Sequence, residues 1–336
     1  MINETKFVIL PIPETFPISS YLPLSIIAAI SLANQSNNEW IYLNFIQLVI
    51  RNGTEKLESF PNQDYMYFPQ QNLSITNLVD ENFIFDKRYL EKNILLWLSN
   101  KNYVVMYCDE YLVPFTRNYK KKHILHSQFI YGVNVSKGVF YCVNFSAKNQ
   151  QLEKLEIPIK DIIEAFFPNL TVMLSDNSYN INNYKHRIVL IKYQAKKISD
   201  SKLEKIHIKE QISDYLNSNN SSIKTSYFTN FISGVWGIEI YNVILKILLE
   251  EREHLDYRMF HLLYEHKLYM KERLLYMKFD NINLENVNYL IQCSNRLRLL
   301  CIKYNIKPCK RLVNKMVELI KSIKQIEIEI LSSIVM

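Results

Sequence analysis

The spacing of apolar residues along this chain changes from one half to the other. In the first half, apolar residues over 5–12 predict a strand, and the prolines after it force an extended backbone. An apolar run over 24–33 predicts a helix buried along much of its surface, with Pro23 in its first turn, as helix starts prefer. The remaining pattern up to residue 100 predicts two more helices and an intervening polar loop, at residues 40–51, 86–100 and 54–80.

A run of β-branched and aromatic residues begins at residue 103 and changes the prediction to strands. Two of these strands form a hairpin whose turn is bracketed by Gly132 and Gly138. The short strand before residue 159 leads into a helix over 160–167. The predicted strands lie at residues 103–108, 128–134, 139–146, 155–158 and 187–193. The first half therefore predicts a mixed arrangement, with helices first and strands later.

The second half is helical, with a heptad-like spacing of apolar residues that predicts an antiparallel helical bundle. Its helices are predicted at residues 205–217, 237–251, 257–278, 284–302 and 310–334. The predicted fold class is therefore α+β. We expect an α+β domain over residues 1–170, a bridging strand region over 171–204 and a helical domain over 205–336, in keeping with domains of roughly 100–200 residues.

Composition excludes several classes of protein. The chain has 336 residues, is 48% hydrophobic and contains only 5 glycines, so a sizeable core is expected and no glycine-rich nucleotide-binding motif occurs. Lys and Arg total 40 against 33 Asp and Glu, a formal net charge of +7. This mild excess fits ordinary solubility, or affinity for an acidic partner such as a carrier protein or its phosphopantetheine. The basic residues are spread and follow no nucleic-acid-binding motif, so no nucleic-acid partner is expected.

The cysteines and histidines form no disulfide or metal pattern. The five cysteines are odd in number and have no CxxC spacing, which favours a reducing cytoplasm over a secreted disulfide framework. The histidines of the second half form no HExxH motif, so neither a metal nor a cofactor is expected. The N-terminus lacks the layout of a signal peptide, and the longest apolar stretch, over 21–33, is too short to span a bilayer. We therefore expect no membrane partner.

Candidate chemistry lies around the predicted hairpin. His126 precedes its first strand and Asn144 lies on its second. Papain-like enzymes hold a base and the polar group that fixes its tautomer on paired strands in this way. His123 follows three lysines and is the alternative base, although we expect it to be exposed. Asp109 and Glu110 are paired acids at a strand end, which fits a solvated turn, a hydrogen bond across a cleft, or recognition of a substrate amine.

Five segments, in this order, resemble the butirosin biosynthesis protein H N-terminal family. They are MYCDEYLVP from residue 106, LHSQFIYGVN from 125, FYCVNF from 140, IPIKDIIEAF from 157 and DYRMFHLLYEHKLYMKERLLYM from 256. The resemblance spans about residues 19–278 and implies a papain-like, cysteine-peptidase-type domain before the helical one. It also implies a function, since members of that family move acyl groups from carrier-protein thioesters to amines, or form amides, in antibiotic, aminoglycoside and nonribosomal peptide biosynthesis.

Carried over to this chain, the family's catalytic histidine corresponds to His126, and Asn144 stands where relatives usually have an aspartate. An asparagine can still orient a histidine. The family's nucleophilic cysteine belongs at the start of the first buried helix, where a helix N-terminus lowers the pKa of a thiol. This sequence has Ser19, Ser20 and Tyr21 there instead. The resemblance thus implies an acyltransferase with a serine nucleophile, Ser20 or its neighbour, and with His126 as its base.

Other interpretations of the same residues stay open. Ser20 fits a plain helix N-cap, and the lack of the thiol fits a catalytically inactive scaffold that binds a carrier protein. A nucleophile elsewhere in the chain and a leader-cleaving peptidase are further alternatives. Cys108 and Cys142 lie on predicted inner strands and are expected in the core. The side chains expected to line a cleft are Ser19, Tyr21, Asp109, Tyr111 and Tyr131.

Overall fold

The computed structural model describes residues 7–35, 39–60, 73–78, 87–166, 188–194, 201–224, 232–250, 252–279 and 282–335. The chain divides into two compact units. Unit 1 comprises Met1–Asn37 and Phe68–Lys196, and unit 2 comprises Asn38–Tyr67 and Lys197–Met336. Both units contain an antiparallel sheet and the C-terminal part of the chain is helical, which confirms the predicted α+β class. The papain-like arrangement of unit 1 stays a prediction.

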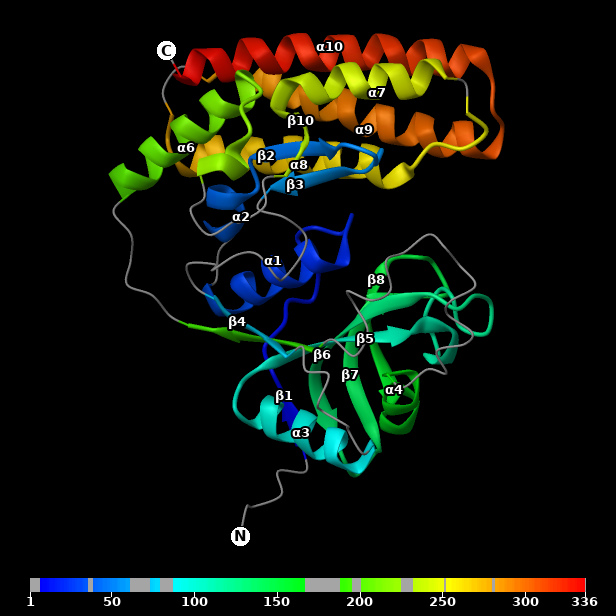
Figure 1. Ribbon diagram of the computed structural model, residues 1–336. Coiled ribbons are helices and arrows are strands. Elements are labelled where there is room, and N and C mark those ends of the chain that lie inside the picture. The colour runs from blue at the N-terminus through cyan, green and yellow to red at the C-terminus, as the bar shows by residue number, and fades with distance from the viewer. Residues whose placement is uncertain are drawn as a thin grey trace. The chain divides into compact units, whose positions relative to one another are not determined.

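Unit 1 is built on an antiparallel sheet. Across this sheet the strands follow the order β4, β9, β5, β6, β7 and β8, and β1 pairs with β6 as the seventh (Figure 1). Their bounds are β1 Phe7–Ile9, β4 Leu73–Leu78, β5 Tyr103–Asp109, β6 Leu125–Asn134, β7 Val139–Phe145, β8 Leu152–Pro158 and β9 Ile188–Tyr193. The central strand β5 is buried along nearly its whole length, so it needs apolar cover on both faces.

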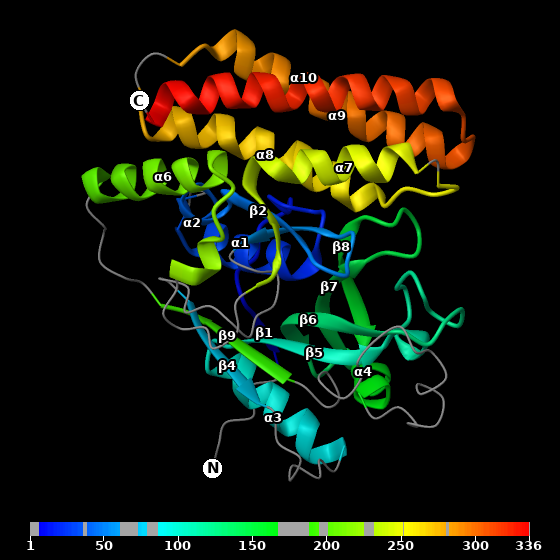
Figure 2. The same cartoon turned by 45° about the horizontal axis from the view of Figure 1, so that its top comes forward.

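Helices supply this cover. In Figures 1 and 2, α1 (Leu22–Gln35) lies over one face of the sheet, and α3 (Lys87–Ser99) and α4 (Ile159–Phe166) lie over the other. Near the end of α1, Asn34 donates a hydrogen bond to the Tyr103 hydroxyl at 3.4 Å. On the α4 side, the Cys108 thiol lies 3.9 Å from the Ile162 carbonyl oxygen. The buried first helix and the strands of the hairpin are thus confirmed.

Two glycines of the hairpin have different roles. β6 pairs with β5 up to Ile130 and with β1 from Gly132 onwards, with a bulge between these two residues. A Cβ atom on Gly132 would lie 2.6 Å from the Val8 carbonyl oxygen, so glycine is what lets β1 approach. Gly138 has φ +67° and lies in the turn between β6 and β7, where this left-handed conformation suits glycine. The prediction that both glycines bracket the turn is therefore correct only for Gly138.

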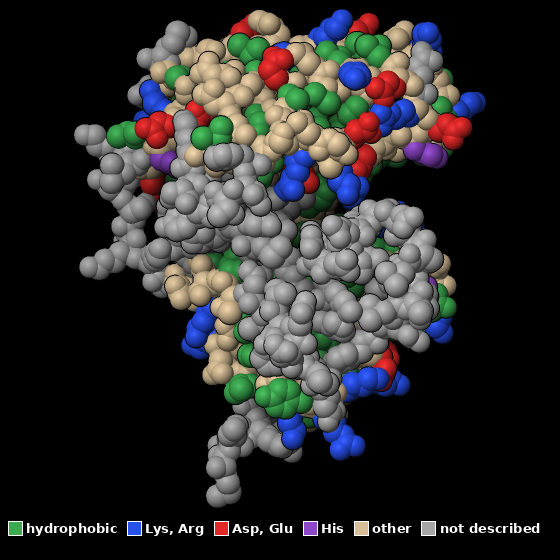
Figure 3. All heavy atoms as spheres, viewed as in Figure 1, with side chains coloured by type: hydrophobic (Ala, Val, Ile, Leu, Met, Phe, Trp, Pro, Cys, Tyr) green, Lys and Arg blue, Asp and Glu red, His purple; other side chains and the backbone are tan. Residues whose placement is uncertain are grey.

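Unit 2 packs helices against a three-stranded antiparallel sheet in the order β10, β2, β3. Its strands are β2 Gln47–Arg51, β3 Leu57–Phe60 and β10 Gly234–Trp236, and its helices are α2 Glu39–Asn44, α6 Ser201–Leu216, α7 Ile240–Leu249, α8 Tyr257–Tyr276, α9 Leu284–Ile306 and α10 Lys310–Val335. α9 packs against α8 and α10, and α10 also packs against α6 and α7. Figure 3 shows basic and acidic side chains mixed with hydrophobic ones over the visible face of these helices. In the described part of the chain, no helix is both long and apolar enough to cross a membrane.

Two elements predicted before residue 80 differ from those found. The helix predicted over 40–51 ends at Asn44, and the strand β2 follows it. Val49 and Ile50 of β2 pair with β10, which lies far along the chain. The polar loop predicted over 54–80 contains β3 and β4. Both differences arise because pairing with a distant strand overrides local periodicity.

The same pairing moves the domain boundaries. Segment 38–67 belongs to unit 2, and not to a first domain over 1–170, because β2 joins the sheet of the helical unit. β9 lies between β4 and β5 inside the sheet of unit 1, and not in a bridge over 171–204. Residues 167–187 lie outside the described part of the chain. The predicted helical domain over 205–336 is thus only one segment of unit 2.

Candidate functional site

Two histidines lie at one end of the sheet in unit 1, where β5 ends and β6 begins. Asp109, the last residue of β5, is opposite Leu125 in the ladder. The pairing continues one residue further, because the Glu110 backbone N–H donates to the Ile124 carbonyl oxygen at 2.9 Å. This register brings two neighbouring carboxylates beside segment 123–126, which carries both histidines.

Glu110 holds His126. Nδ1 of His126 lies 3.0 Å from Oε1 of Glu110, at ion-pair distance although outside hydrogen-bond geometry. The side chain of Glu110 is 3% exposed and that of His126 is 35% exposed, so the acid is buried and the ring reaches solvent. Glu110 also accepts hydrogen bonds from Asn118 and, at 3.3 Å, from Asn144. Burial alone would raise the pKa of Glu110, but His126, Asn118 and Asn144 outweigh it and hold that pKa below its usual value.

Asn144 is predicted to orient His126, but its amide group binds elsewhere. Its Nδ2 donates to Gln128 at 2.7 Å and to Glu110, and its Oδ1 accepts from the Phe145 backbone N–H. Gln128 lies two residues beyond His126 on β6, so Asn144 sits roughly 7 Å further along the sheet. Glu110 therefore occupies the orienting position, and Asn144 fixes Glu110. The sequence indicated this acid only as one of a pair at a strand end.

A second histidine–carboxylate pair lies at the same end of the sheet. Nδ1 of His123 is 2.6 Å from Oδ2 of Asp109, whose side chain is 2% exposed, while that of His123 is 34% exposed. Oδ1 of Asp109 accepts from the Tyr111 backbone N–H at 3.1 Å and caps the short 3-10 helix Glu110–Leu112. The Tyr111 ring stacks on His123 with centroids 4.1 Å apart. Asp109 and Tyr111 are both predicted to line a cleft. They thus lie together around His123, the alternative base.

Both pairs prepare a histidine for proton transfer. In each, a carboxylate engages Nδ1, which favours the tautomer that carries its proton on Nδ1 and leaves Nε2 as the basic nitrogen. The same carboxylate stabilises the imidazolium that forms when Nε2 accepts a proton. Each ring is also partly exposed, so a substrate proton can reach it.

The start of α1 carries the hydroxyl groups that stand where a thiol is expected. The Tyr21 carbonyl oxygen accepts from the Ser25 N–H at 2.9 Å, so Tyr21 is the N-cap residue, and neither serine is. Ser20 is 3% exposed and its hydroxyl oxygen is buried, whereas Ser19 is half-buried. Ser19 is therefore the more accessible of the two to a substrate. An approach of either hydroxyl to His126 stays a prediction.

Three further candidate residues lie in the core. Tyr131 is 6% exposed, its ring centroid is 6.1 Å from that of Tyr141, and burial raises its pKa to about 12. It is five residues from His126 along β6, roughly 17 Å, so it does not line the same site. Burial raises the thiol pKa of Cys108 and of Cys142. Both therefore stay protonated, as expected of core residues and not of nucleophiles.

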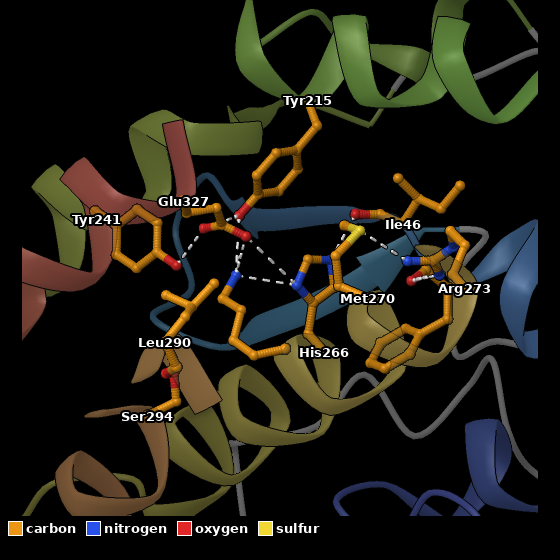
Figure 4. Close-up of polar contacts among 11 residues, drawn as sticks. Ile46, Tyr215, Tyr241, His266, Met270, Arg273, Leu290, Ser294 and Glu327 are labelled. Atoms are coloured by element: carbon orange, nitrogen blue, oxygen red, sulfur yellow. Dashed lines mark hydrogen bonds and ion pairs between the residues drawn. The ribbon is translucent and has the colours of Figure 1, made fainter. Parts of the chain in front are cut away.

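Unit 2 contains a polar cluster of another kind (Figure 4). Lys267 of α8 and Glu327 of α10 form an ion pair in which neither side chain is exposed. Oε2 of Glu327 accepts from the hydroxyls of Tyr215 at 3.2 Å and Tyr241 at 2.6 Å. Nζ of Lys267 is also 3.0 Å from Nδ1 of His266, whose Nε2 is 2.7 Å from a backbone carbonyl oxygen. His266 thus donates through Nε2 and accepts through Nδ1 as a neutral ring, and burial lowers its pKa well below the usual value.

A neighbouring buried cation, Arg273, caps the end of α2. Its guanidinium donates to the carbonyl oxygens of Ile41, Tyr42 and Phe45. Its positive charge faces the carbonyl end of α2, and burial lowers its pKa to about 9. Because these charges are satisfied inside unit 2, we assign this cluster to packing and not to a substrate site.

The sequence contains a sign of this cluster that belongs to no motif. Buried positions of α10 recur every three or four residues, and Glu327 occupies one of them between Ile323 and Ile330. His266 and Lys267 interrupt the buried stripe of α8 in the same way. Ionisable side chains at core positions of a helix need buried partners, so their positions in the stripe point to an ion pair.

No protein-family model matches the chain, and no curated protein matches its sequence. The resemblance carried by the order of the motifs therefore stays a prediction. Across the described ranges, no group of three or more His, Cys, Asp or Glu side chains is arranged to hold a metal ion. The candidate site thus rests on its own geometry: two histidine–carboxylate pairs at the end of β5.

Proposed function

We propose that the protein transfers an acyl group from a carrier-protein thioester to an amine, at the end of β5 in unit 1. The observation that carries the proposal is the presence of two partly exposed histidines, each with Nδ1 against a buried carboxylate. Acyl transfer needs a base that takes a proton from the attacking group and returns it to the leaving group, and a histidine held in this way can do both. The order of the sequence motifs supports the substrate class, a phosphopantetheine thioester and an amine acceptor in antibiotic or nonribosomal peptide assembly.

In the form that the motif order favours, the hydroxyl of Ser20 or Ser19 attacks the thioester carbonyl carbon. His126 accepts the hydroxyl proton and passes it to the departing pantetheine thiol. Glu110 holds His126, and Asn144 holds Glu110. The amine then attacks the resulting ester, the histidine takes its proton, and the serine oxygen leaves with that proton. Backbone N–H groups at the start of α1 are suited to holding the oxyanion.

The loop between β5 and β6 supports an acidic partner for this reaction. It carries four exposed basic side chains, at Arg117, Lys120, Lys121 and Lys122. Phe115 in the same loop is 57% exposed and has φ +66°, a left-handed conformation that is costly for a bulky residue. An exposed aromatic ring beside concentrated positive charge suits a surface that binds an acidic carrier domain and the phosphate of its pantetheine arm.

We also propose the cytoplasm as the compartment of this reaction. All five cysteines are free thiols, and four of them are buried. Free thiols are the rule in a reducing compartment, whereas secreted proteins of comparable cysteine content usually form disulfides.

One observation favours a second function. The hydroxyl oxygen of Ser20 is buried, and a serine hydroxyl is a far weaker nucleophile than a thiolate near neutral pH. In this alternative the protein is a catalytically inactive scaffold that binds a carrier domain through the basic loop and forms no acyl adduct.

Intact mass spectrometry after incubation with acyl-carrier thioesters tests the two functions. Wild type, Ser20→Cys and Ser19→Cys are compared, because a thiol restores an efficient nucleophile at the same position. We expect an acyl adduct on a cysteine variant and an amide product once an amine is added. If no variant is acylated while a carrier protein still binds, the scaffold function replaces the proposal.

A double variant of the loop, compared with a control outside the loop, tests carrier binding apart from acyl transfer. Lys120→Glu and Lys121→Glu together should weaken carrier binding about tenfold or more at low salt, because they reverse the charge that faces an acidic partner. Lys92→Glu and Lys101→Glu together, both exposed in unit 1 and outside this loop, serve as the control with the same change of charge. Equal effects of the two changes would show that the loop does not bind the carrier.

A further inference from the structure

The two histidine pairs lie on opposite faces of the sheet. Side chains alternate along a strand, and residues directly opposite each other in a ladder share a face. Asp109 therefore shares its face with Leu125 and with His123, two residues before Leu125, in agreement with its 2.6 Å contact to the His123 ring. Cys108 and His126 are opposite each other and share the other face.

The partners of each histidine follow the same division. Tyr111 lies in the 3-10 helix that follows β5, and its ring stacks on that of His123. Glu110 begins the same helix, and its carboxylate meets the ring of His126 instead. The sheet itself separates the pairs, so a group that approaches one face meets one histidine only.

α1 covers the face of Asp109 and His123. Tyr103 is six residues before Asp109 on β5 and therefore lies on the same face. Its hydroxyl accepts a hydrogen bond from Asn34 of α1 at 3.4 Å. The opposite face, that of Cys108, is covered by α4. Figure 1 shows α1 and α4 on these two sides of the sheet.

α1 also begins at the end of the sheet where Asp109 lies. Its last turn contacts Tyr103, the first residue of β5. α1 has 14 residues and β5 has 7, so both span roughly 20 Å at 1.5 Å per helical residue and 3.3 Å per strand residue. In Figure 1 the helix runs back along the strand, and its first turn lies toward the end of β5 that carries Asp109. The residues before α1 and His123 thus share a face and an end of the sheet.

We infer that His123 is the catalytic base for a nucleophile at the start of α1, and that Asp109 is its positioning residue. The inference rests on the proposed acyl transfer, and it gives His123 the role that the motif order gives to His126. Tyr111 fixes the plane of the His123 ring by stacking on it. His126 and Glu110, on the face of α4, stabilise the end of the sheet.

The transfer balances in two half-reactions. Nε2 of His123 takes the hydroxyl proton of the serine while the serine oxygen bonds to the thioester carbonyl carbon. The C–S bond then breaks, and the carrier thiolate leaves with the proton from His123. In the second half-reaction the amine nitrogen bonds to the ester carbon and gives its proton to His123. The C–O bond breaks, and the serine oxygen takes up that proton.

Thiol reactivity tests the assignment without any carrier protein. In the Ser19→Cys and Ser20→Cys backgrounds, alkylation by iodoacetamide is followed against pH by peptide mass spectrometry, which separates the new cysteine from the five native ones. A histidine beside a thiol lowers its pKa and supplies thiolate at pH 6–7. In at least one background we expect His123→Asn to lower the rate at pH 6.5 on the order of tenfold. His126→Asn tests the base that the motif order favours, and the exposed His254→Asn is the matched control, which should alter the rate less than about twofold.

Asp109→Asn gives a readout specific to positioning. It leaves the thiol and the imidazole in place but removes the acceptor that holds Nδ1. We expect the inflection of the alkylation profile to move up towards about 8.5, the usual thiol pKa, with an unchanged rate at high pH. Circular dichroism checks the fold of each variant, and the corresponding Gln or Glu change replaces one that fails to fold.

Two outcomes overturn the assignment: a loss with His126→Asn and none with His123→Asn, or equally small effects of both in both backgrounds. The acyl-transfer assay stays a separate measurement. If alkylation depends on His123 and no variant is acylated by any carrier thioester, the assignment of the base stands and the proposed function fails.

Discussion

The end of β5 in unit 1 and the buried cluster of unit 2 use the same chemical groups in opposite settings. Both combine histidine, carboxylate and tyrosine. At the end of β5, the side chains of His123 and His126 are 34% and 35% exposed above buried carboxylates. In unit 2 the side chains of His266, Lys267 and Glu327 have no exposed surface. The first arrangement leaves a basic nitrogen within reach of a substrate, and the second satisfies its charges inside the unit (Figure 4).

This difference follows from what each setting permits. A base must change its charge during a reaction and must meet the proton it abstracts, so it needs a route to the substrate. A sealed ion pair cannot change charge without a large desolvation penalty, so its network instead fixes how neighbouring helices pack. We therefore expect substitutions at the sheet end to affect reactivity most, and substitutions in the helical core to affect stability most.

The largest expected effect on stability comes from breaking the buried ion pair between Lys267 and Glu327. Lys267→Met leaves Glu327 buried and uncompensated, so the free energy of unfolding of unit 2 should fall by about 3–5 kcal/mol. Urea unfolding followed by tryptophan fluorescence measures it, since Trp40 and Trp236 belong to unit 2 and a Trp97→Phe background removes the signal of unit 1.

Two variants control this prediction. Lys324→Met removes a partly exposed pair with Glu239 in the same unit, in which the side chains are 23% and 47% exposed, and should cost less than about 1 kcal/mol. The double variant Lys267→Met/Glu327→Leu should recover much of the loss, because it replaces two charges by apolar side chains. A loss for Lys267→Met as small as that for Lys324→Met would contradict the structural role of the Lys267–Glu327 pair.

Glu110→Gln should lower the stability of unit 1 by about 1–3 kcal/mol at pH 7, because a buried acceptor of several hydrogen bonds loses its charge. The pKa of Glu110 is below its usual value. Its stabilisation is therefore complete above the unfolded-state pKa, about 4.3, and is lost as the pH falls through the lower folded-state pKa. Urea unfolding at pH 7 and at pH 3 should show the difference from wild type shrink. The exposed Glu156→Gln is the control, and a difference that does not depend on pH would refute the explanation.

The buried His266 should make the stability of unit 2 depend on pH in mild acid. The pKa of His266 is lowered by burial and by the charge of Lys267, so below about pH 6.5 the unfolded chain binds a proton that the folded unit does not. Stability should then fall with decreasing pH by up to about 1.4 kcal/mol per pH unit. His266→Gln, which keeps a donor and an acceptor, should remove that contribution between pH 5 and 8. The exposed His254→Gln should leave it in place, and an equal slope in both variants would assign the effect elsewhere.

The smallest expected effect on stability is that of a change at His123. His123→Asn should cost no more than about 1 kcal/mol, because its ring is partly exposed and bonds a carboxylate that also caps the 3-10 helix. The same variant should lower thiol reactivity at the start of α1. A loss of stability above about 2 kcal/mol would place His123 with the structural residues and not with the chemistry.

The sequence alone determined most of the elements, because their periodicity is local. The helix predicted over 86–100 is Lys87–Ser99, and that predicted over 310–334 is Lys310–Val335. The hairpin strands and the α+β class followed from alternation and from β-branched composition in the same way. The sequence also indicated the segment with both histidines, and the two acids at the end of β5, as candidates for the site.

Tertiary structure decided the partners of these elements and residues. Segment 40–51 divides into a helix and a strand because β10 pairs with it from far along the chain. Glu110, and not Asn144, meets His126 because the ladder places Asn144 opposite a later residue of β6. Alternation can assign two histidines three residues apart to opposite faces, but only the packing of α1 determines which face it covers. That packing joins residues distant in sequence, and no local pattern carries it.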